Sequence, residues 1–118
     1  MKRIICGAMV ALTVTAAGAA EDPGSANHML PGCKYAFERE RSGSDLFSWG
    51  YCMGIVWGIA HMLHKFPGDF CADMPAATTN KEMVAVVIRY IEARPSVRDL
   101  PFEGLAIEAL VQAWPCKR

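Results

Sequence analysis

The sequence predicts an all-α fold: a small four-helix domain stapled by two disulfides. Four segments carry helical spacing or helix-boundary residues, and turns rich in Pro, Gly and Ser separate them. No segment favours a strand over a helix. After the first 20 residues the chain holds an even number of cysteines, at Cys33, Cys52, Cys71 and Cys116. A domain of this size gains limited stability from its core, so we expect cross-links.

The first 20 residues read as a secretory signal peptide. Two basic residues precede an apolar run at 4–14, and a stretch of small residues follows. We expect cleavage after Ala19 or Ala20, which leaves 21–118 as a single mature domain and predicts a periplasmic location. Two of the twelve basic residues leave with the signal, so ten remain against twelve acidic residues. The net charge is then near −2, and no basic stripe suggests a nucleic-acid partner.

The first two helices are predicted on either side of the turn Ser42-Gly43-Ser44. Residues 21–28 are polar and read as a loose lead-in. Pro is tolerated at the start of a helix, so Pro31 predicts a first helix that runs to about Arg41. Ser44 is a good N-cap for a second helix from Asp45 to about Lys65, which the following Pro-Gly pair ends.

A capping box predicts where the third helix begins. Thr79 as N-cap and Glu82 three residues later can each satisfy a free backbone amide at this end of the helix, which then runs to about Ala93. Because the segment is rich in β-branched residues, a strand over Met83–Tyr90 is the alternative. The helix is favoured because four apolar residues share one of its faces: Met83, Val87, Tyr90 and Ile91.

A connector at 94–101, with the sequence RPSVRDLP, leads into the last helix. It contains two prolines and is predicted to be compact. Pro101 opens the last helix, which continues through Trp114 to the terminating Pro115. The apolar positions of this helix are Leu105, Ile107, Leu110, Val111 and Trp114.

Gly50, Gly54 and Gly58 fall on one stripe of the second helix, since residues four apart lie almost above one another. Each costs about 1 kcal/mol relative to Ala in a helix, so we expect the backbone of a neighbouring helix to pack closely there. Trp57, between two of these glycines, is expected in the core. A membrane span over 46–63 is the alternative, because this segment has no formal charge and small residues at four-residue spacing mediate helix contact in lipid.

The four cysteines allow three pairings. If the first two helices form an antiparallel hairpin, residues equidistant from the turn lie at the same height. The midpoint of Cys33 and Cys52 falls within Ser42-Gly43-Ser44, which favours this pair. Cys71 and Cys116 then pair by elimination, and their bond would enclose the third and fourth helices.

Four motifs give the chain a resemblance to a known family. They are "GYCMGIVWGI" at 50–59, "FC" at 70–71, "MVAVVIRYIEARP" at 83–95 and "LPFEGLAIEALVQAWPC" at 100–116. In this order the chain resembles the Tai-type, or resistance-associated, immunity proteins of bacteria with type VI secretion. The resemblance implies a helical periplasmic protein, often a homodimer. It would bind a peptidoglycan amidase effector and occlude the active-site cleft of that enzyme.

Partner contacts are expected on the connector. Arg94, Ser96, Arg98 and Asp99 project from a short segment stiffened by proline, and preordering lowers the entropy cost of binding. The alternative for these residues is an ordinary solvated turn. The alternative function is a general periplasmic stress or chaperone-like protein that binds many clients without a cognate toxin.

Neither catalysis nor a cofactor is expected. A cysteine nucleophile needs a free thiolate, and each mature cysteine has a disulfide partner available. His61 and His64 lie three residues apart on the second helix, which is suitable spacing for metal ligands, but a zinc site needs three or four. We therefore expect no bound metal and no enzyme activity.

Overall fold

The computed structural model describes residues 22–38, 45–66 and 68–117 of the 118-residue chain. These residues form four α-helices with two short 3-10 turns, η1 (Tyr35–Phe37) and η2 (Pro95–Val97). The all-α prediction is confirmed, and so are both predicted disulfides, Cys33–Cys52 and Cys71–Cys116. The expected signal peptide and the N-cap at Ser44 lie outside the described residues.

The first helix, α1 (Ala26–Lys34), begins five residues before the predicted start. Pro31 lies inside α1, where it removes one backbone hydrogen bond without ending the helix. The Ser25 hydroxyl accepts a hydrogen bond from the His28 amide and so caps the helix. The prediction of a loose lead-in through His28 is therefore wrong, and so is that of a helix opening at Pro31.

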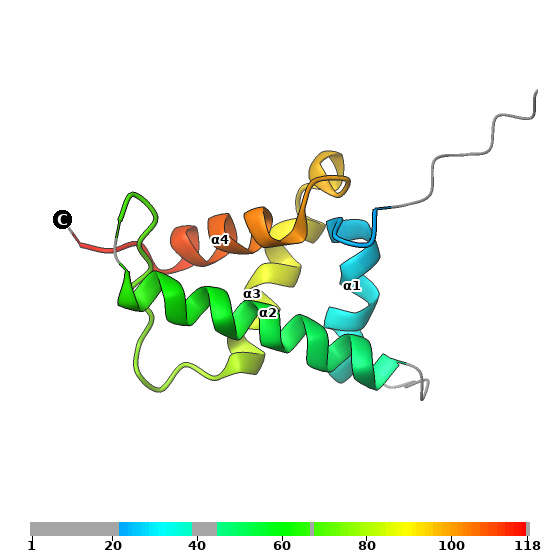
Figure 1. Ribbon diagram of the computed structural model, residues 1–118, viewed down its shortest axis with the longest axis horizontal. Coiled ribbons are helices and arrows are strands. Elements are labelled where there is room, and N and C mark those ends of the chain that lie inside the picture. Colours follow the sequence, from blue (N-terminus) through cyan, green and yellow to red (C-terminus); the bar gives the residue numbers. More distant parts are fainter. Residues whose placement is uncertain (1–21, 39–44, 67, 118) are drawn as a thin grey trace, which may run out of the picture.

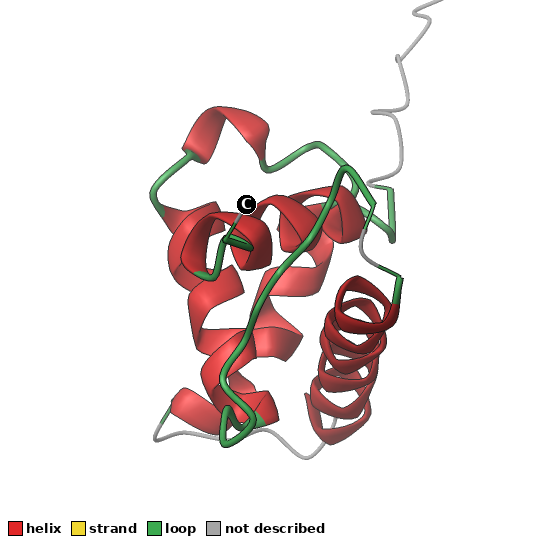
Figure 2. Ribbon diagram, turned by 90° about the vertical axis from the view of Figure 1, so that its left-hand side faces the viewer, coloured by secondary structure: helices red, strands yellow, loops and turns green. Residues whose placement is uncertain are grey.

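The second helix, α2 (Asp45–Lys65), has the predicted bounds. It packs against α1, α3 and α4 through a buried face that contains Cys52, Val56, Ala60 and Leu63. By length and composition alone, its segment Leu46–Lys65 could cross a membrane, and 22% of its apolar window is buried in the fold. Figure 2 shows α2 along one side of the molecule, so the face of α2 opposite its buried residues is turned away from the other helices.

α3 (Asn80–Glu92) begins with the predicted capping box. The Thr79 hydroxyl accepts from the Glu82 amide at 3.1 Å, and the Glu82 carboxylate accepts from the Thr79 amide at 2.9 Å. The strand alternative is wrong for this segment. α4 (Phe102–Ala113) packs against α3, with Pro101 and Trp114 as its caps, and both helices contribute to one core with α1 and α2.

The sequence predicted that a neighbouring helix packs closely against the glycines of α2, and this prediction is wrong. A Cβ at Gly50, Gly54 or Gly58 would meet no atom within 4 Å. The close approach between helices instead occurs at Gly32 of α1, where a Cβ would lie 2.6 Å from the Ser48 Cβ. α1 crosses α2 steeply at this point, rather than running antiparallel to it as a hairpin would (Figure 1).

Candidate partner-binding surface

The connector, residues 94–101, is hydrogen-bonded to the first turn of α1. The Arg98 carbonyl accepts from the Asn27 amide at 2.8 Å, and the Leu100 carbonyl accepts from the Ala26 amide at 3.0 Å. The first amides of a helix have no partner within that helix, so the connector satisfies groups that would otherwise need water. The connector thereby holds α1 against the start of α4 (Figure 1).

The predicted contact residue Arg94 is held by α3. Its guanidinium lies over the Tyr90 ring, 3.7 Å from the centroid, and its Nη1 donates to the Tyr90 carbonyl at 3.0 Å. The Tyr90 hydroxyl in turn donates to a Glu108 carboxylate oxygen of α4 at 2.7 Å. This hydrogen bond raises the pKa of Tyr90, because ionisation would remove the donated proton. Arg94, Tyr90 and Glu108 thus form a series of side-chain contacts that links α3 with α4.

Arg98 and Asp99 lie beside α1. The exposed Asp99 carboxylate accepts a long hydrogen bond of 3.4 Å from the Asn27 side chain. Arg98 is half-buried, and its Nε has no acceptor among the described residues. Ser96 is exposed on η2. The structure therefore brings Arg98 and Asp99 together at the junction with α1, whereas Arg94 is engaged with α3.

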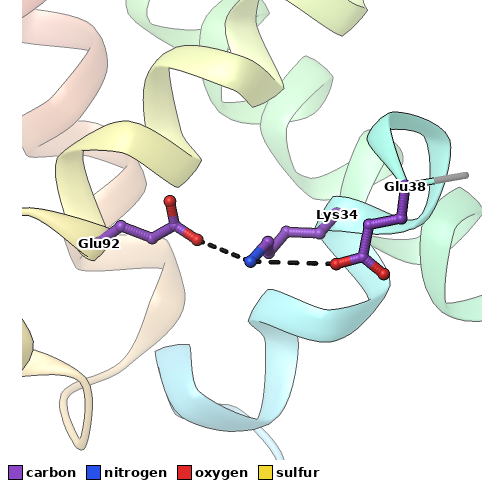
Figure 3. Close-up of polar contacts among 3 residues, drawn as sticks. All are labelled: Lys34, Glu38 and Glu92. Carbon is purple, nitrogen blue, oxygen red and sulfur yellow. Dashed lines mark ion pairs between the residues drawn. The ribbon is translucent and has the colours of Figure 1, made fainter.

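A cluster of charged side chains borders Arg98. The Lys34 ammonium of α1 lies 2.8 Å from Glu92 of α3 and 3.9 Å from Glu38 (Figure 3). The hydrogen bond with Glu92 is the main reason that the pKa of Lys34 is raised, since it stabilises the charged form. Arg98 joins these three residues in lining a polar cavity of about 340 Å³.

Sequence analysis missed Lys34 and Glu92 as neighbours of the connector. They come from helices that are distant in the sequence, and no local motif predicts their pairing. The signal that was present is the order of charges at the end of α1 and just after η1, because Lys34 and Glu38 have the i, i+4 spacing of a helical ion pair. That pair is the longer and weaker of the two contacts.

The histidines of α2 and the four cysteines are the other candidate site residues. Both histidines of α2 are exposed, and the His61 ring stacks on Trp57 at a centroid distance of 5.2 Å. Within the described ranges, no group of three His, Cys, Asp or Glu residues could hold a metal ion. All four cysteines at 33, 52, 71 and 116 are in disulfides, so none supplies a thiolate.

Together, the fold and this surface define a small disulfide-linked helical protein that presents polar side chains on a fixed connector. The chain belongs to the Rap1a immunity protein family, since the model of that family matches residues 25–116. It is therefore an immunity protein against a secreted effector of type VI secretion. Proteins of this family are typically periplasmic. No curated protein and no solved structure gives a significant match.

Proposed function

We propose that this protein is a Tai-type immunity protein of the periplasm that inhibits a peptidoglycan amidase. The family match over residues 25–116 carries the proposal, because it covers both disulfides and all four helices. Residues 1–20 would direct export and be removed after Ala19 or Ala20, which leaves the domain at 21–118. Disulfides are typical of an oxidising compartment such as the periplasm, and two are present.

The proposed contact surface is the connector, with Arg94, Ser96, Arg98 and Asp99. Its backbone is fixed by hydrogen bonds to α1, so little conformational entropy is lost on binding. Ser96 and Asp99 are exposed, and Arg98 adds a half-buried guanidinium. A guanidinium suits a carboxylate of the partner, which it can bind through two hydrogen bonds.

Inhibition would be steric. The connector would enter or cover the catalytic cleft of the amidase, and substrate would be excluded by a rigid surface that undergoes no chemistry. Lys34 and Glu92 join α1 to α3 beside Arg98 and so help to fix the position of α1. The proposal also includes a homodimer, with a contact face that leaves the connector accessible.

The experiment is an affinity capture from periplasmic and secreted extracts with the oxidised mature protein, followed by mass spectrometry and an assay of peptidoglycan hydrolysis. One stoichiometric partner with amidase activity that is lost in the complex supports the proposal. The double change Arg98→Ala and Asp99→Ala should then weaken binding of that partner at least tenfold. The matched control is Arg89→Ala with Asp73→Ala, a pair of exposed charges outside the connector. Equal affinity of both double variants would remove the connector from the interface.

A general chaperone-like binding protein is the second candidate. The observation that favours it is the exposed apolar surface of α2, which includes Phe47 and Trp57 at 82% and 55% exposure. Such a protein would capture many clients weakly and would not silence an amidase. The same capture experiment therefore separates the two functions.

A further inference from the structure

The two disulfides differ in how deeply they are buried. Cys33 and Cys52 join α1 to α2, and both residues are 0% exposed. Cys71 and Cys116 join the loop that follows α2 to the tail that follows α4, and both residues are half-buried. Because thiol–disulfide exchange needs a thiolate to reach a sulfur atom, a reductant reaches the second bond more readily in the folded chain.

The buried bond lies in the core of the fold. Cys33 and Cys52 belong to the cluster of buried residues to which all four helices contribute. α1 and α2 would have to separate before a reductant could touch this bond, and such an opening costs much of the stability of the domain. Reduction of this bond should therefore be slow while the chain is folded.

The loop that carries Cys71 is long for a connection between two helices. α2 ends at Lys65 and α3 begins at Asn80, so fourteen residues separate them. Connections in helical bundles usually have about 2–8 residues. We call residues 68–79 the α2–α3 loop. A loop of this length keeps much of its conformational freedom unless contacts with the rest of the chain hold it.

Two backbone contacts between described residues lie beside the half-buried disulfide. The Asp73 amide donates a hydrogen bond to the Trp114 carbonyl at 2.8 Å. Ala72 forms an isolated antiparallel bridge with Pro115, and its small side chain is buried. Both contacts join the same two segments as the disulfide, the α2–α3 loop and the tail. Since one hydrogen bond contributes little net stability, the disulfide is the main constraint that keeps the loop beside the tail.

The α2–α3 loop forms one wall of two hollows in the surface. The first, of about 610 Å³, lies between the loop, α3 and Trp114, and Ala85 and Val86 of α3 line it. The second, of about 210 Å³, lies between the loop and α2, and Trp57 and Met83 line it. Trp57, which the sequence predicted in the core, is 55% exposed. Detachment of the loop would open both hollows and expose more apolar surface of α3.

We propose that Cys71–Cys116 is a site of reversible thiol–disulfide exchange with a protein dithiol of the thioredoxin class, and that its reduction releases the α2–α3 loop from the tail. One thiolate of the dithiol attacks a sulfur of the bond, which gives a mixed disulfide and frees the other cysteine. The second thiol of the dithiol then breaks the mixed disulfide. Two electrons pass to the bond between Cys71 and Cys116, two protons end on their thiols, and the dithiol becomes a disulfide.

This exchange site does not depend on the function proposed above. The α2–α3 loop and the C-terminal tail lie at one end of the molecule, and α1 with the connector lies at the other (Figure 1). Cys33–Cys52 stays oxidised and keeps α1 on α2, so the connector keeps its hydrogen bonds to α1. Reduction thus changes one end of the molecule and leaves the other end folded.

The first test compares the reduction rates of the two bonds. The oxidised mature chain is treated with dithiothreitol under native conditions and quenched with acid. The free thiols are then alkylated, and the cysteine peptides are quantified by mass spectrometry. Cys71 and Cys116 should become labelled at least about tenfold faster than Cys33 and Cys52, which are the internal control. Equal rates would mean that both bonds are reduced only when the whole domain unfolds, and would overturn the proposal.

The second test replaces dithiothreitol with thioredoxin that is kept reduced by its reductase and NADPH. Selective labelling of Cys71 and Cys116 supports a site for a protein dithiol, because a protein must reach the bond at the surface. A thioredoxin variant without its second cysteine should be trapped as a mixed disulfide with one of these two residues. Reduction by dithiothreitol but not by thioredoxin overturns the assignment to a protein dithiol.

The third test measures whether loss of the bond releases the loop. The double change Cys71→Ser and Cys116→Ser removes the bond. Amide hydrogen exchange should then become faster at residues 68–79 and 114–117 and should stay at the wild-type rate in α1 and the connector. Unchanged exchange in the α2–α3 loop would show that other contacts hold it and would overturn its release. Loss of helical circular dichroism would show that the bond supports the whole core, and it would also overturn the proposal.

Discussion

Gly32 of α1 and Gly54 of α2 lie in helices that pack together, yet their surroundings are opposite. A Cβ at Gly32 would lie 2.6 Å from the Ser48 Cβ and 3.0 Å from the Ser48 carbonyl carbon and oxygen. A Cβ at Gly54 would meet nothing within 4 Å. Gly32 is buried next to the Cys33–Cys52 disulfide. Gly54 is exposed on what we call the outer face of α2, the side of this helix that carries the exposed residues Phe47, Trp57 and Met62. The fold of one chain explains the first glycine, whereas no contact within the described residues explains the second.

The difference teaches that a regular spacing of glycines does not reveal which backbone they approach. The stripe in α2 predicts close packing, but the structure places that packing on a single glycine of α1 that follows a proline. Substitutions among the buried residues, the inner side of the fold, should therefore affect the stability of one chain more than substitutions on the outer face of α2.

Two phenylalanines separate the inner and outer sides most strongly. Phe102 of α4 is completely buried, so Phe102→Ala should lower the free energy of unfolding by about 4 kcal/mol through lost burial and a cavity. Phe47 is 82% exposed, and Phe47→Ala should change the stability of the monomer by less than about 0.5 kcal/mol. Urea denaturation at a dilution where the chain is monomeric measures both. Similar losses for the two variants would contradict the assignment of an outer face.

The two glycines should respond to alanine with opposite signs. Gly32→Ala forces α1 away from Ser48 and should cost about 2 kcal/mol, or about 10 °C in Tm for a domain of this size. Gly54→Ala improves helix propensity in open space and should stabilise the monomer by up to about 1 kcal/mol. Thermal denaturation followed by circular dichroism measures the two shifts.

Ser48 provides the control for the Gly32 effect. Ser48→Ala retains the Cβ that obstructs the new methyl group, so it should not rescue Gly32→Ala. Ser48→Gly removes that atom and should recover part of the loss, while the backbone contact at 3.0 Å remains. Equal behaviour of the two Ser48 variants would mean that the Cβ contact does not cause the destabilisation.

Local signals in the sequence were sufficient for much of the fold. The capping box at Thr79 predicted the start of α3, because both of its hydrogen bonds lie within four residues. The start of α1 also had a local signal, an apolar i, i+3, i+4, i+7 set that follows the N-cap Ser25: Ala26, Met29, Leu30 and Cys33. The reading of Pro31 as a first helical residue obscured it.

The surroundings of the candidate site could be predicted only in part. The connector was recognised from its prolines and charged residues, but its hydrogen bonds to Ala26 and Asn27 join segments that are distant in the sequence. The contact of Lys34 with Glu92 likewise depends on how α1 packs on α3. Such contacts follow from tertiary packing, which periodicity within one helix does not specify.

The smallest expected effect concerns two polar contacts between helices, Lys34 with Glu92 and Tyr90 with Glu108, at alkaline pH. Lys34 has a folded pKa above its ordinary value of 10.5, mainly because of its hydrogen bond with Glu92. Tyr90 has a folded pKa above 10.0, mainly because it donates to Glu108. Since both pKa values are raised by folding, both groups contribute their full stability below about pH 10. They lose it as the pH rises through the folded values.

Stability should therefore fall as the pH is raised above about 10, and two conservative variants assign the loss. Lys34→Arg keeps its charge at that pH, and Tyr90→Phe has no proton to lose, so each should flatten the decline. The Lys34 contribution is at most about 1 kcal/mol, because Lys34 and Glu92 are 38% and 39% exposed and solvent screens the pair. Urea denaturation between pH 8 and about 11.5 measures the slopes. Phe47→Ala, on the outer face, should retain the wild-type slope, and a slope unchanged by both conservative variants would contradict a role for these links in stability.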